Sequence, residues 1–119
     1  MRRGDLCWAD LEPRSGSEQR GRRPVILLSH DGFNETPNWR SVIVVPCTTS
    51  EAQKRRGPTV VFLPQGTGGL KQDCAAICHQ ITTLDRSKLT QRIGSLPESA
   101  MREVEAGIRA AIDLDPPEA

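Results

Sequence analysis

The residues best suited to chemistry in this sequence are cations gathered in two polar segments. The first segment, residues 15–24, reads Ser-Gly-Ser-Glu-Gln-Arg-Gly-Arg-Arg-Pro and joins two apolar runs. Its arginines carry planar, permanently charged forks that suit phosphate. Gly16 and Gly21 allow tight turns that bring backbone amides close to a ligand. Long ordered loops tend to be functional, so we interpret this segment as an anion-binding loop, with a solvated connection as the alternative.

The second segment, Thr48 to Gly57, combines hydroxyls with three further cations. If the fold brings the two segments together, they form a groove that fits a polyanion. The cationic residues of this groove are Arg14, Arg20, Arg22, Arg23, Lys54, Arg55 and Arg56. The net charge of +1 conceals an uneven distribution, because residues 1–97 hold 14 bases and nine acids, a balance of +5. An anionic partner for this part of the chain is therefore expected.

RNA cleavage needs a proton acceptor, a proton donor and cations beside the phosphate, and the sequence offers few groups for proton transfer. The only histidines are His30 and His79. His30 ends an apolar run and is expected to be structural. His79 is open between the two roles, and Gln80 beside it offers an amide that can read a base. Among the few aromatic residues we consider only Trp39 for base stacking, with packing as the favoured role.

No metal or other cofactor is expected. Cys74, Cys78 and His79 suggest zinc, but in a strand residues four apart lie ~13 Å from each other, which is too far for one ion. No cluster of carboxylates offers a magnesium site. The four cysteines, in a chain without an export signal, are expected to be reduced and buried as small apolar residues.

The size of the chain predicts one compact domain over residues 1–114, followed by a flexible tail at 115–119. With 119 residues, 36% of them apolar, a second domain would be hard to fit. The start of the sequence does not resemble a secretion signal, and its apolar runs are too short to cross a bilayer. We expect a soluble cytoplasmic protein with no membrane partner.

The segments that position these residues predict a small β barrel. Short runs of strand-forming residues are separated by glycine and proline, which favours a barrel over a parallel α/β sheet. The expected strands are Gly4–Leu11, Val25–Leu28, Ser41–Cys47, Thr59–Leu63 and Cys74–Ile81. In the first strand, Leu6 and Trp8 share one face.

The last element is expected to be a helix that packs one face on the barrel. Ser95 followed by Glu98 has the spacing of a capping box. Ion pairs four residues apart are expected between Glu98 and Arg102 and between Glu105 and Arg109. Apolar residues recur at helical spacing at Met101, Val104, Ile108 and Ala111 or Ile112.

Five motifs in order closely resemble the MazF/PemK toxins, the endoribonuclease toxins of bacterial toxin–antitoxin pairs. The motifs are Arg3-Gly4-Asp5, the loop from Gly16-Ser17-Glu18-Gln19 to Gly21-Arg22-Arg23-Pro24, Val45-Pro46-Cys47-Thr48-Thr49-Ser50, Gly69-Leu70-Lys71-Gln72-Asp73 and Gln80-Ile81. The resemblance runs from about Arg3 to Leu114.

The resemblance implies a mainly β, SH3-like barrel of the CcdB/MazF type with a C-terminal helix. It also implies a homodimer that cleaves single-stranded mRNA at short sequences without a metal. The family's catalytic arginine and threonine fall on Arg23 and Thr48. Many members carry an acid where this chain has His79. Residues expected to bind the substrate are Glu18, Gln19, Arg20, Arg22, Thr49, Ser50, Lys54, Arg55, His79 and Gln80.

Two alternatives share this scaffold. A CcdB-like toxin would bind DNA gyrase and leave nucleic acid intact, and a non-catalytic barrel would bind RNA without cutting it; fold alone does not decide between them. Arg23 and Thr48 favour the nuclease, whose products would be a 2′,3′-cyclic phosphate and a 5′-hydroxyl. A small antitoxin with an acidic, initially disordered segment is the expected protein partner.

Overall fold

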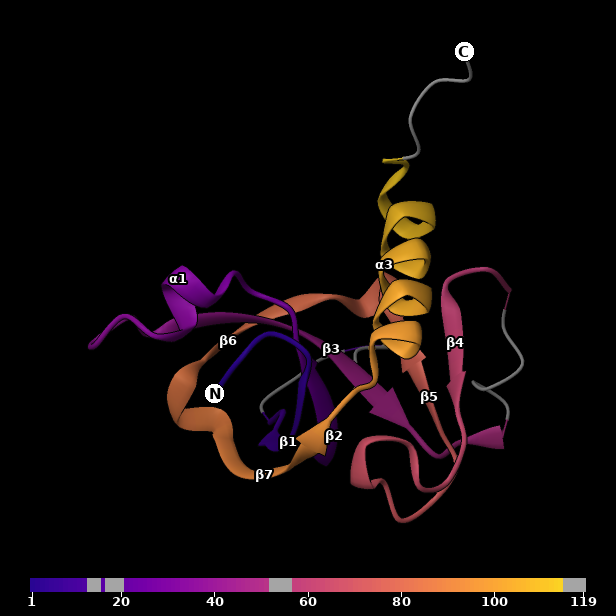
Figure 1. The fold of residues 1–119 in the computed structure, drawn as a ribbon, viewed down its shortest axis with the longest axis horizontal. Helices are drawn as coiled ribbons and strands as arrows, with labels where there is room; N and C mark the ends of the chain where they lie inside the picture. The colour runs from indigo at the N-terminus through magenta and orange to yellow at the C-terminus, as the bar shows by residue number, and fades with distance from the viewer. Residues whose placement is uncertain (13–15, 17–20, 52–56, 115–119) are drawn as a thin grey trace.

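The computed structural model describes residues 1–12, 16, 21–51 and 57–114, which form antiparallel strands and a C-terminal helix (Figure 1). The strands are β1 (Asp5–Asp10), β2 (Arg22–Leu27), β3 (Ser41–Thr48), β4 (Val60–Leu63), β5 (Cys74–Ile77), β6 (Thr82–Asp85) and β7 (Leu89–Ser95). The helices are α1 (Asp31–Asn34) and α3 (Glu98–Ile112), and the short 3-10 turns are η1 (Thr67–Gly69), η2 (Cys78–Gln80) and η3 (Arg86–Lys88). The expected mainly β fold with a C-terminal helix is confirmed.

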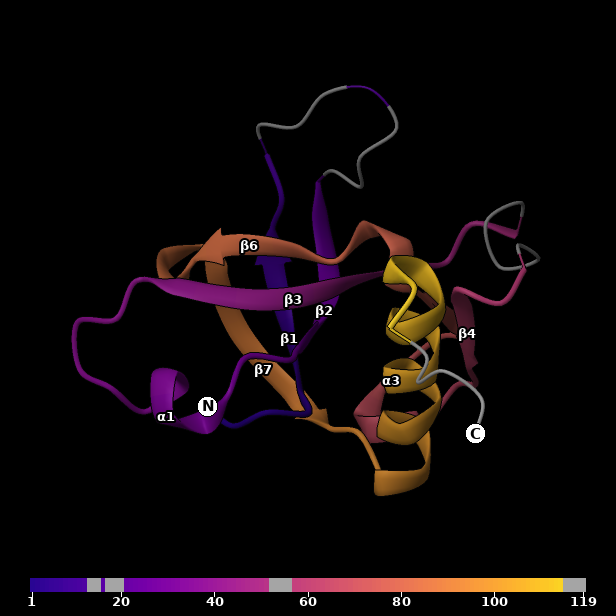
Figure 2. The ribbon, with the colours of Figure 1, turned by 90° about the horizontal axis from the view of Figure 1, so that it is seen from above.

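Strand β3 is the central strand of this arrangement. The strands follow the order β4-β5-β3-β2-β1-β7, and β6 also pairs with β3. One edge of β3 pairs with β2 over residues 44–46. The opposite edge pairs first with β6, over residues 41–44 (Figure 2). It then pairs with β5, over residues 47 and 48. The C-terminal end of β3, where the predicted catalytic threonine lies, is therefore held between β2 and β5.

Two apolar clusters fill the two faces of this sheet. The first lies under α3 and includes Leu6, Ile26, Val45, Leu63, Met101 and Val104. The second lies on the other face and includes Cys7, Val25, Leu27, Val42, Val44 and Leu84. The strand alternation of apolar residues explains this division, since Leu6 and Cys7 contribute to different clusters. Both clusters anchor β1, β2 and β3, the strands that carry the candidate site.

Two strand boundaries differ from the expectation. Strand β2 begins at Arg22 instead of near Pro24, so Arg22 and Arg23 are strand residues that pair with Asp10 and Ala9 of β1. The expected fifth strand is divided, because the chain leaves β5 after Ile77 and turns through η2 before β6. In that turn the amide of Ile81 donates to the carbonyl of Cys78 at 3.2 Å.

Strands β6 and β7 were not expected from the sequence. Strand β7 has no fully buried residue, and its pairing with β1 shifts register at two points. An irregular strand without a buried face shows no alternation of apolar and polar residues, which is the signal that sequence reasoning depends on.

The predicted cap of the C-terminal helix is wrong. Helix α3 begins at Glu98 with Pro97 at the cap position and no side-chain cap, and Ser95 lies in β7. The pair of Glu98 with Arg102 is confirmed at 2.6 Å. Glu105 instead meets Arg3 at 2.8 Å, because the N-terminal segment runs beside the helix.

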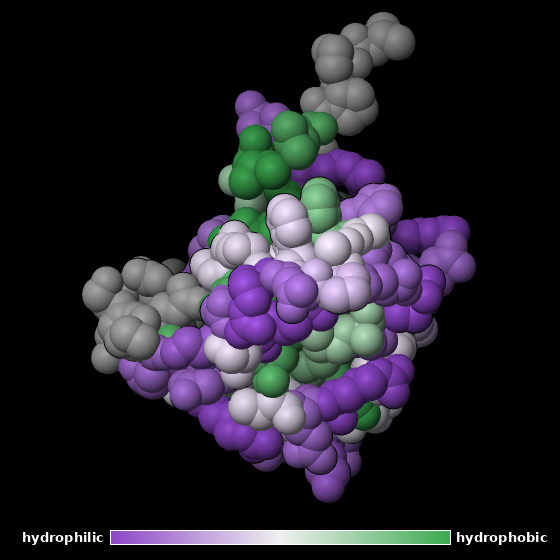
Figure 3. Space-filling model, turned by 90° about the vertical axis from the view of Figure 1, so that its left-hand side faces the viewer, coloured by the Kyte–Doolittle hydropathy of each residue, from purple (hydrophilic) through white to green (hydrophobic). Residues whose placement is uncertain are grey.

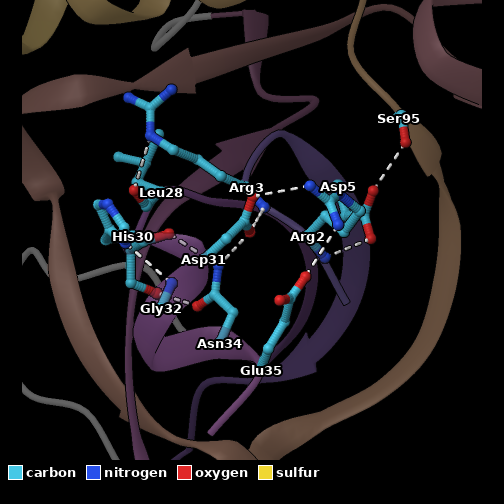
Figure 4. A network of polar contacts seen from close by, with 11 residues as sticks. Arg2, Arg3, Asp5, Leu28, His30, Asp31, Gly32, Asn34, Glu35 and Ser95 are labelled. Carbon is cyan, nitrogen blue, oxygen red and sulfur yellow. Dashed lines mark hydrogen bonds and ion pairs between the residues drawn. The ribbon is translucent and has the colours of Figure 1, made fainter.

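The Arg3-Gly4-Asp5 motif ties the first strand to distant parts of the chain (Figure 4). Asp5 is almost buried, and its carboxylate accepts from the Arg2 amide at 3.0 Å and the Ser95 hydroxyl at 2.7 Å. The Arg3 amide donates to Asp31 at 2.7 Å. Burial alone would raise the pKa of Asp5, but the hydrogen bonds of Ser95 and Arg2 and the charge of Arg92 hold it below its usual value. The motif thus has a structural role.

Most of the surface shown in Figure 3 is hydrophilic, and apolar surface gathers beside the end of α3, where Ile112 and Leu114 are exposed. No helix within residues 1–12, 16, 21–51 and 57–114 is long and apolar enough to cross a membrane.

Candidate active site

The two predicted catalytic residues lie just beyond the end of the ladder between β2 and β3. The ladder pairs Ile26 with Val45 and ends where Val25 pairs with Pro46. Arg23 and Thr48 each lie two residues beyond this last pair, Arg23 beside Ala9 of β1 and Thr48 beside Ala75 of β5. Pro46, in the last pair, and Pro24, next to that pair, carry no N–H, so the ladder loses donors at this end. Arg23 and Thr48 therefore lie at the same end of the β2–β3 pair, where its ladder stops.

Thr48 closes a tight turn at the end of β3. Its side-chain oxygen accepts a hydrogen bond from the Ser50 amide at 3.1 Å, the geometry of a turn made by a hydroxyl residue. Thr48 is only 2% exposed, whereas Thr49 and Ser50 are exposed. The hydroxyl proton of Thr48 is not used in this bond, so the hydroxyl can still donate to a second acceptor.

A cavity of about 560 Å³ opens beside this pair. Its apolar part is formed by Trp8, Pro24, Cys47, Leu70, Cys74 and Ile93. Its polar part is formed by Arg22, Arg23, Thr49, Lys71, Gln72, Gln91 and Arg92. Four of these polar residues are cations, and none is an acid. The cavity therefore suits an anion that also presents an apolar surface.

Glycines let the segment before β5 approach the cavity closely. Gly68 has φ +57, and a side chain there would come within 2.8 Å of the Ser95 carbonyl oxygen. The segment therefore lies against the backbone of β7 and leads directly to Lys71 and Gln72. Asp73 accepts from the Gln65 amide at 2.7 Å and closes the loop. The motif Gly69-Leu70-Lys71-Gln72-Asp73 thus supplies one wall of the site.

Arg22 lies over the indole ring of Trp8, with its guanidinium carbon 4.3 Å from the ring centre. Sequence reasoning assigned no role to Trp8, Lys71, Gln72, Gln91 or Arg92. For Trp8 the sequence did give an indication, because strand alternation puts Trp8 on the same face of β1 as the buried residue Leu6, one step closer to the loops. Trp39 was the aromatic residue considered for base stacking. Its ring stacks on that of Phe33 with ring centres 4.8 Å apart, which agrees with the favoured packing role.

Comparisons with known proteins identify the family. Residues 2–112 match the family model described as PemK-like, MazF-like toxins of type II toxin–antitoxin systems. This chain belongs to that family.

Three relatives illustrate the similarity. Endoribonuclease MazF6 of Mycobacterium tuberculosis is 37% identical over 112 residues, which cover 94% of this chain and 96% of the relative. The solved structure of M. tuberculosis toxin MazF-mt6 aligns with a TM-score of 0.73 and 27% identity over 93% of this chain and 98% of that one. A mycobacterial endoribonuclease in complex with its cognate antitoxin aligns with a TM-score of 0.77 and 22% identity over 98% and 99% of the two chains.

In this MazF-family toxin, His79 and Gln80 lie apart from the cavity. Both belong to η2, beyond the far end of β5, and neither lines the cavity. The Nδ1 atom of His79 is 2.7 Å from the Thr59 hydroxyl oxygen. His30 accepts from the Gly32 amide at 2.8 Å and caps α1, so its structural role is confirmed.

Several expected RNA contacts of this toxin lie outside the described residues, and so does the expected tail at 115–119. These contacts are Glu18, Gln19, Arg20, Lys54 and Arg55, together with Arg14 and Arg56 of the expected groove. Among the described candidates, Arg22, Arg23 and Thr49 line the cavity, and Thr48 and Ser50 form the turn beside it.

The cysteines of this MazF-family chain are buried and free. Burial raises the pKa of Cys47 well above its usual range and that of Cys78 to about 11. These thiols stay protonated near neutral pH and are poor nucleophiles. Within the part of the chain that the structure describes, no three His, Cys, Asp or Glu residues are grouped so that they could hold a metal.

Proposed function

We propose that this protein is the endoribonuclease toxin of a toxin–antitoxin pair and that it cuts single-stranded RNA at the opening between β2 and β3. The observation that carries the proposal is a cavity lined by four cations, Arg23 among them, next to the turn that Thr48 makes at the end of β3. Relatives named endoribonucleases support the nuclease over a gyrase-binding toxin of the CcdB type. The chain is accordingly an enzyme.

The proposed reaction is an internal transfer within the RNA. The 2′-hydroxyl oxygen attacks the adjacent phosphorus, and the bond from phosphorus to the 5′-oxygen breaks. A proton leaves the 2′-hydroxyl and another reaches the departing 5′-oxygen, so the products are a 2′,3′-cyclic phosphate and a 5′-hydroxyl. Negative charge increases on the non-bridging oxygens in the transition state, which is where preorganised donors are most effective.

Arg23 is assigned to this developing charge, because its fork can donate two hydrogen bonds to one phosphate. Thr48 is assigned as a second donor. Since Thr48 is almost buried, the turn that includes Ser50 must shift slightly for its hydroxyl to reach a phosphate oxygen. A guanidinium is a poor base, and His79 lies apart from the cavity, so Glu18 or water is the better candidate for proton transfer.

The cations of the chain take the place that a metal has in other nucleases. Arg22, Arg23 and Lys71 line the cavity and can share the charge of the scissile phosphate and its neighbours. Arg92 also lines the cavity, but it is paired with Asp5 at 3.3 Å. The reaction is therefore expected to proceed without a divalent ion. Cleavage at short sequences requires base contacts in addition to phosphate contacts.

A homodimer and an acidic antitoxin complete the proposal. A small barrel with one helix leaves apolar strand residues uncovered, and Ile43 of β3 and Phe62 of β4 are 41% and 51% exposed. A second copy of the chain would cover such surface. Solved relatives include endoribonuclease and antitoxin complexes. An acidic segment of an antitoxin would compete with RNA for the cavity's cations.

The test is to incubate the purified protein with a long mRNA in EDTA and map the new ends, with Arg23→Ala as the control. Cleavage at recurring short sequences, lost in the variant, would support the proposal. Intact RNA that is retarded on a gel would favour an RNA-binding barrel. Intact RNA together with gyrase complexes would favour the CcdB-like alternative.

A further inference from the structure

The cavity has an aromatic and apolar part that phosphate binding does not require. Phosphate is held by cations and hydrogen-bond donors, and Arg22, Arg23, Lys71 and Arg92 supply these. Trp8, Pro24 and Leu70 in the same cavity offer surface that phosphate cannot use. A concave site with an apolar lining and a few convergent polar groups suits a planar organic ring.

The stack of Arg22 on Trp8 provides a flat platform for such a ring. The indole supports one face of the guanidinium, 4.3 Å away, and Arg22 is exposed. An arginine held flat in this way offers its other face to a base, and bases of single-stranded RNA commonly stack on guanidinium planes and aromatic rings. Lysine would keep the charge at this position but has no planar group to stack.

Two side-chain amides lie beside this platform. Gln91 is opposite Trp8 in the pairing of β7 with β1, and Gln72 enters the cavity from the segment before β5. Neither side-chain amide is hydrogen-bonded to another group among the residues that the structure describes, and both residues are exposed. An amide can donate to and accept from the edge of a base.

We propose that this cavity is a nucleobase-binding subsite of the RNase, next to the phosphate that is cut. The base stacks on Arg22, which Trp8 supports, and its polar edge meets Gln72 and Gln91. The cations of the cavity can only donate hydrogen bonds. The site therefore favours a nucleobase whose edge presents carbonyl oxygens as acceptors, which is uracil or guanine. The inference rests on the proposed function and identifies the groups that select the RNA sequence.

Fluorescence can report on the subsite directly, because the chain has only two tryptophans. Replacing Trp39 by Phe, away from the cavity, leaves Trp8 as the sole indole. This protein is titrated with three uncleavable 2′-O-methyl octanucleotides: oligo(U), oligo(A) and an abasic chain of the same length. Oligo(U) should quench Trp8 and bind roughly tenfold or more tightly than the abasic chain, since stacking of one base has an effect of this order. Equal binding of oligo(U) and the abasic chain would overturn the proposal.

Variants then separate base contacts from charge. Arg22→Lys should lower affinity for oligo(U) toward that of the abasic chain and leave affinity for the abasic chain nearly unchanged. Gln91→Ala should reduce the preference for oligo(U) over oligo(A). Arg40→Lys is the matched control, since Arg40 precedes β3 and lies ~23 Å along that strand from Cys47. Equal losses for oligo(U) and the abasic chain in Arg22→Lys would show that Arg22 acts only on phosphate.

The two proposals fail in different ways. Binding to uncleavable oligonucleotides does not depend on catalysis, so a protein that cuts no RNA can still show the base preference. If the protein does cut RNA, mapping the ends for Gln91→Ala should show relaxed selection at one position beside the cut. Unchanged selection there would contradict the subsite and leave the nuclease proposal intact.

Discussion

Arg23 and Thr48 each lie two residues beyond the last pair of the β2–β3 ladder, Val25 with Pro46. Arg23 precedes and Thr48 follows a stretch that is fixed in the core, because Val25 and Val44 are fully buried. Their backbones are therefore positioned by the sheet, while the prolines next to the opening prevent the ladder from continuing. Two residues that are held by a rigid sheet at the end of a strand pair are suited to catalysis, because preorganised hydrogen-bond donors lose little freedom when the substrate binds.

Arg23→Ala is expected to lower the rate of RNA cleavage about 10²–10³-fold, the usual effect of removing one preorganised donor. Arg23→Lys should recover little, because a point charge does not replace the two-pronged contact. Single-turnover cleavage of a defined RNA measures both. Arg23→Lys with nearly full activity would show that charge alone is needed, and the matched substitution Arg40→Lys should leave the rate unchanged.

Thr48→Val and Thr48→Ser separate the hydroxyl of Thr48 from its shape. Valine preserves the volume but removes the acceptor for the Ser50 amide and the donor for phosphate, so a loss of about 10²-fold or more is expected. Serine keeps the hydroxyl and should retain most activity. Thermal unfolding should show that both variants are folded. An active Thr48→Val protein would assign the catalytic role to another residue.

The sequence predicted features well where the chemistry of a residue type restricts it to one structural role. Cations beside glycines predicted an anion site, and Arg22 and Arg23 of that segment do line a cavity with two further cations. The role of Thr48, at the end of β3, was implied by the family resemblance and stays a prediction. Runs of β-branched residues such as Val42 to Val45 predicted the central strand, because such residues favour strands. These features are local, so neighbouring residues are enough to define them.

The sequence failed where the structure depends on distant partners. The alternation of β1 puts Trp8 on the same face as Leu6, but the sequence does not show that β7 and the segment before β5 close around it. Ser95 was expected to cap a helix, but its hydroxyl donates a hydrogen bond to the buried carboxylate of Asp5, which is 90 residues away in the sequence. Glu105 likewise pairs with Arg3, which no helical spacing predicts.

Asp5→Asn should destabilise the protein at neutral pH, and the difference from the wild type should shrink in acid. The pKa of Asp5 is lowered in the folded state, so its carboxylate stabilises the fold above the unfolded value of about 3.9 and loses this effect as pH falls through the folded value. A loss of roughly 1–3 kcal/mol in the free energy of unfolding is expected near pH 7. Urea unfolding from pH 7 to pH 3 tests this; a difference that does not depend on pH would contradict it.

Gly107→Ala should destabilise the protein although alanine favours helices. The added Cβ would lie 2.7 Å from the Sγ atom of Cys78, and both residues are buried. Crowding of this kind costs about 1–3 kcal/mol, more than the gain of about 1 kcal/mol in helix propensity. Cys78→Ala should offset part of the loss in the double variant. Additive effects of the two substitutions in thermal unfolding would show that the crowding is absent.

An acidic antitoxin segment should inhibit the nuclease by occupying the cations that otherwise meet RNA. Arg22, Arg23 and Lys71 line one cavity that has no acid in its lining, so carboxylates of an extended segment can replace phosphates there. Inhibition of RNA cleavage by a synthetic peptide from the neighbouring gene's product should weaken as salt is raised from about 0.05 to 0.3 M, because exposed charges are screened. Lys71→Ala should weaken inhibition several-fold, and Lys88→Ala, a cation outside the cavity, serves as its control. A peptide with its acids changed to amides should inhibit poorly; equal inhibition by the two peptides would show that binding is apolar and takes place elsewhere.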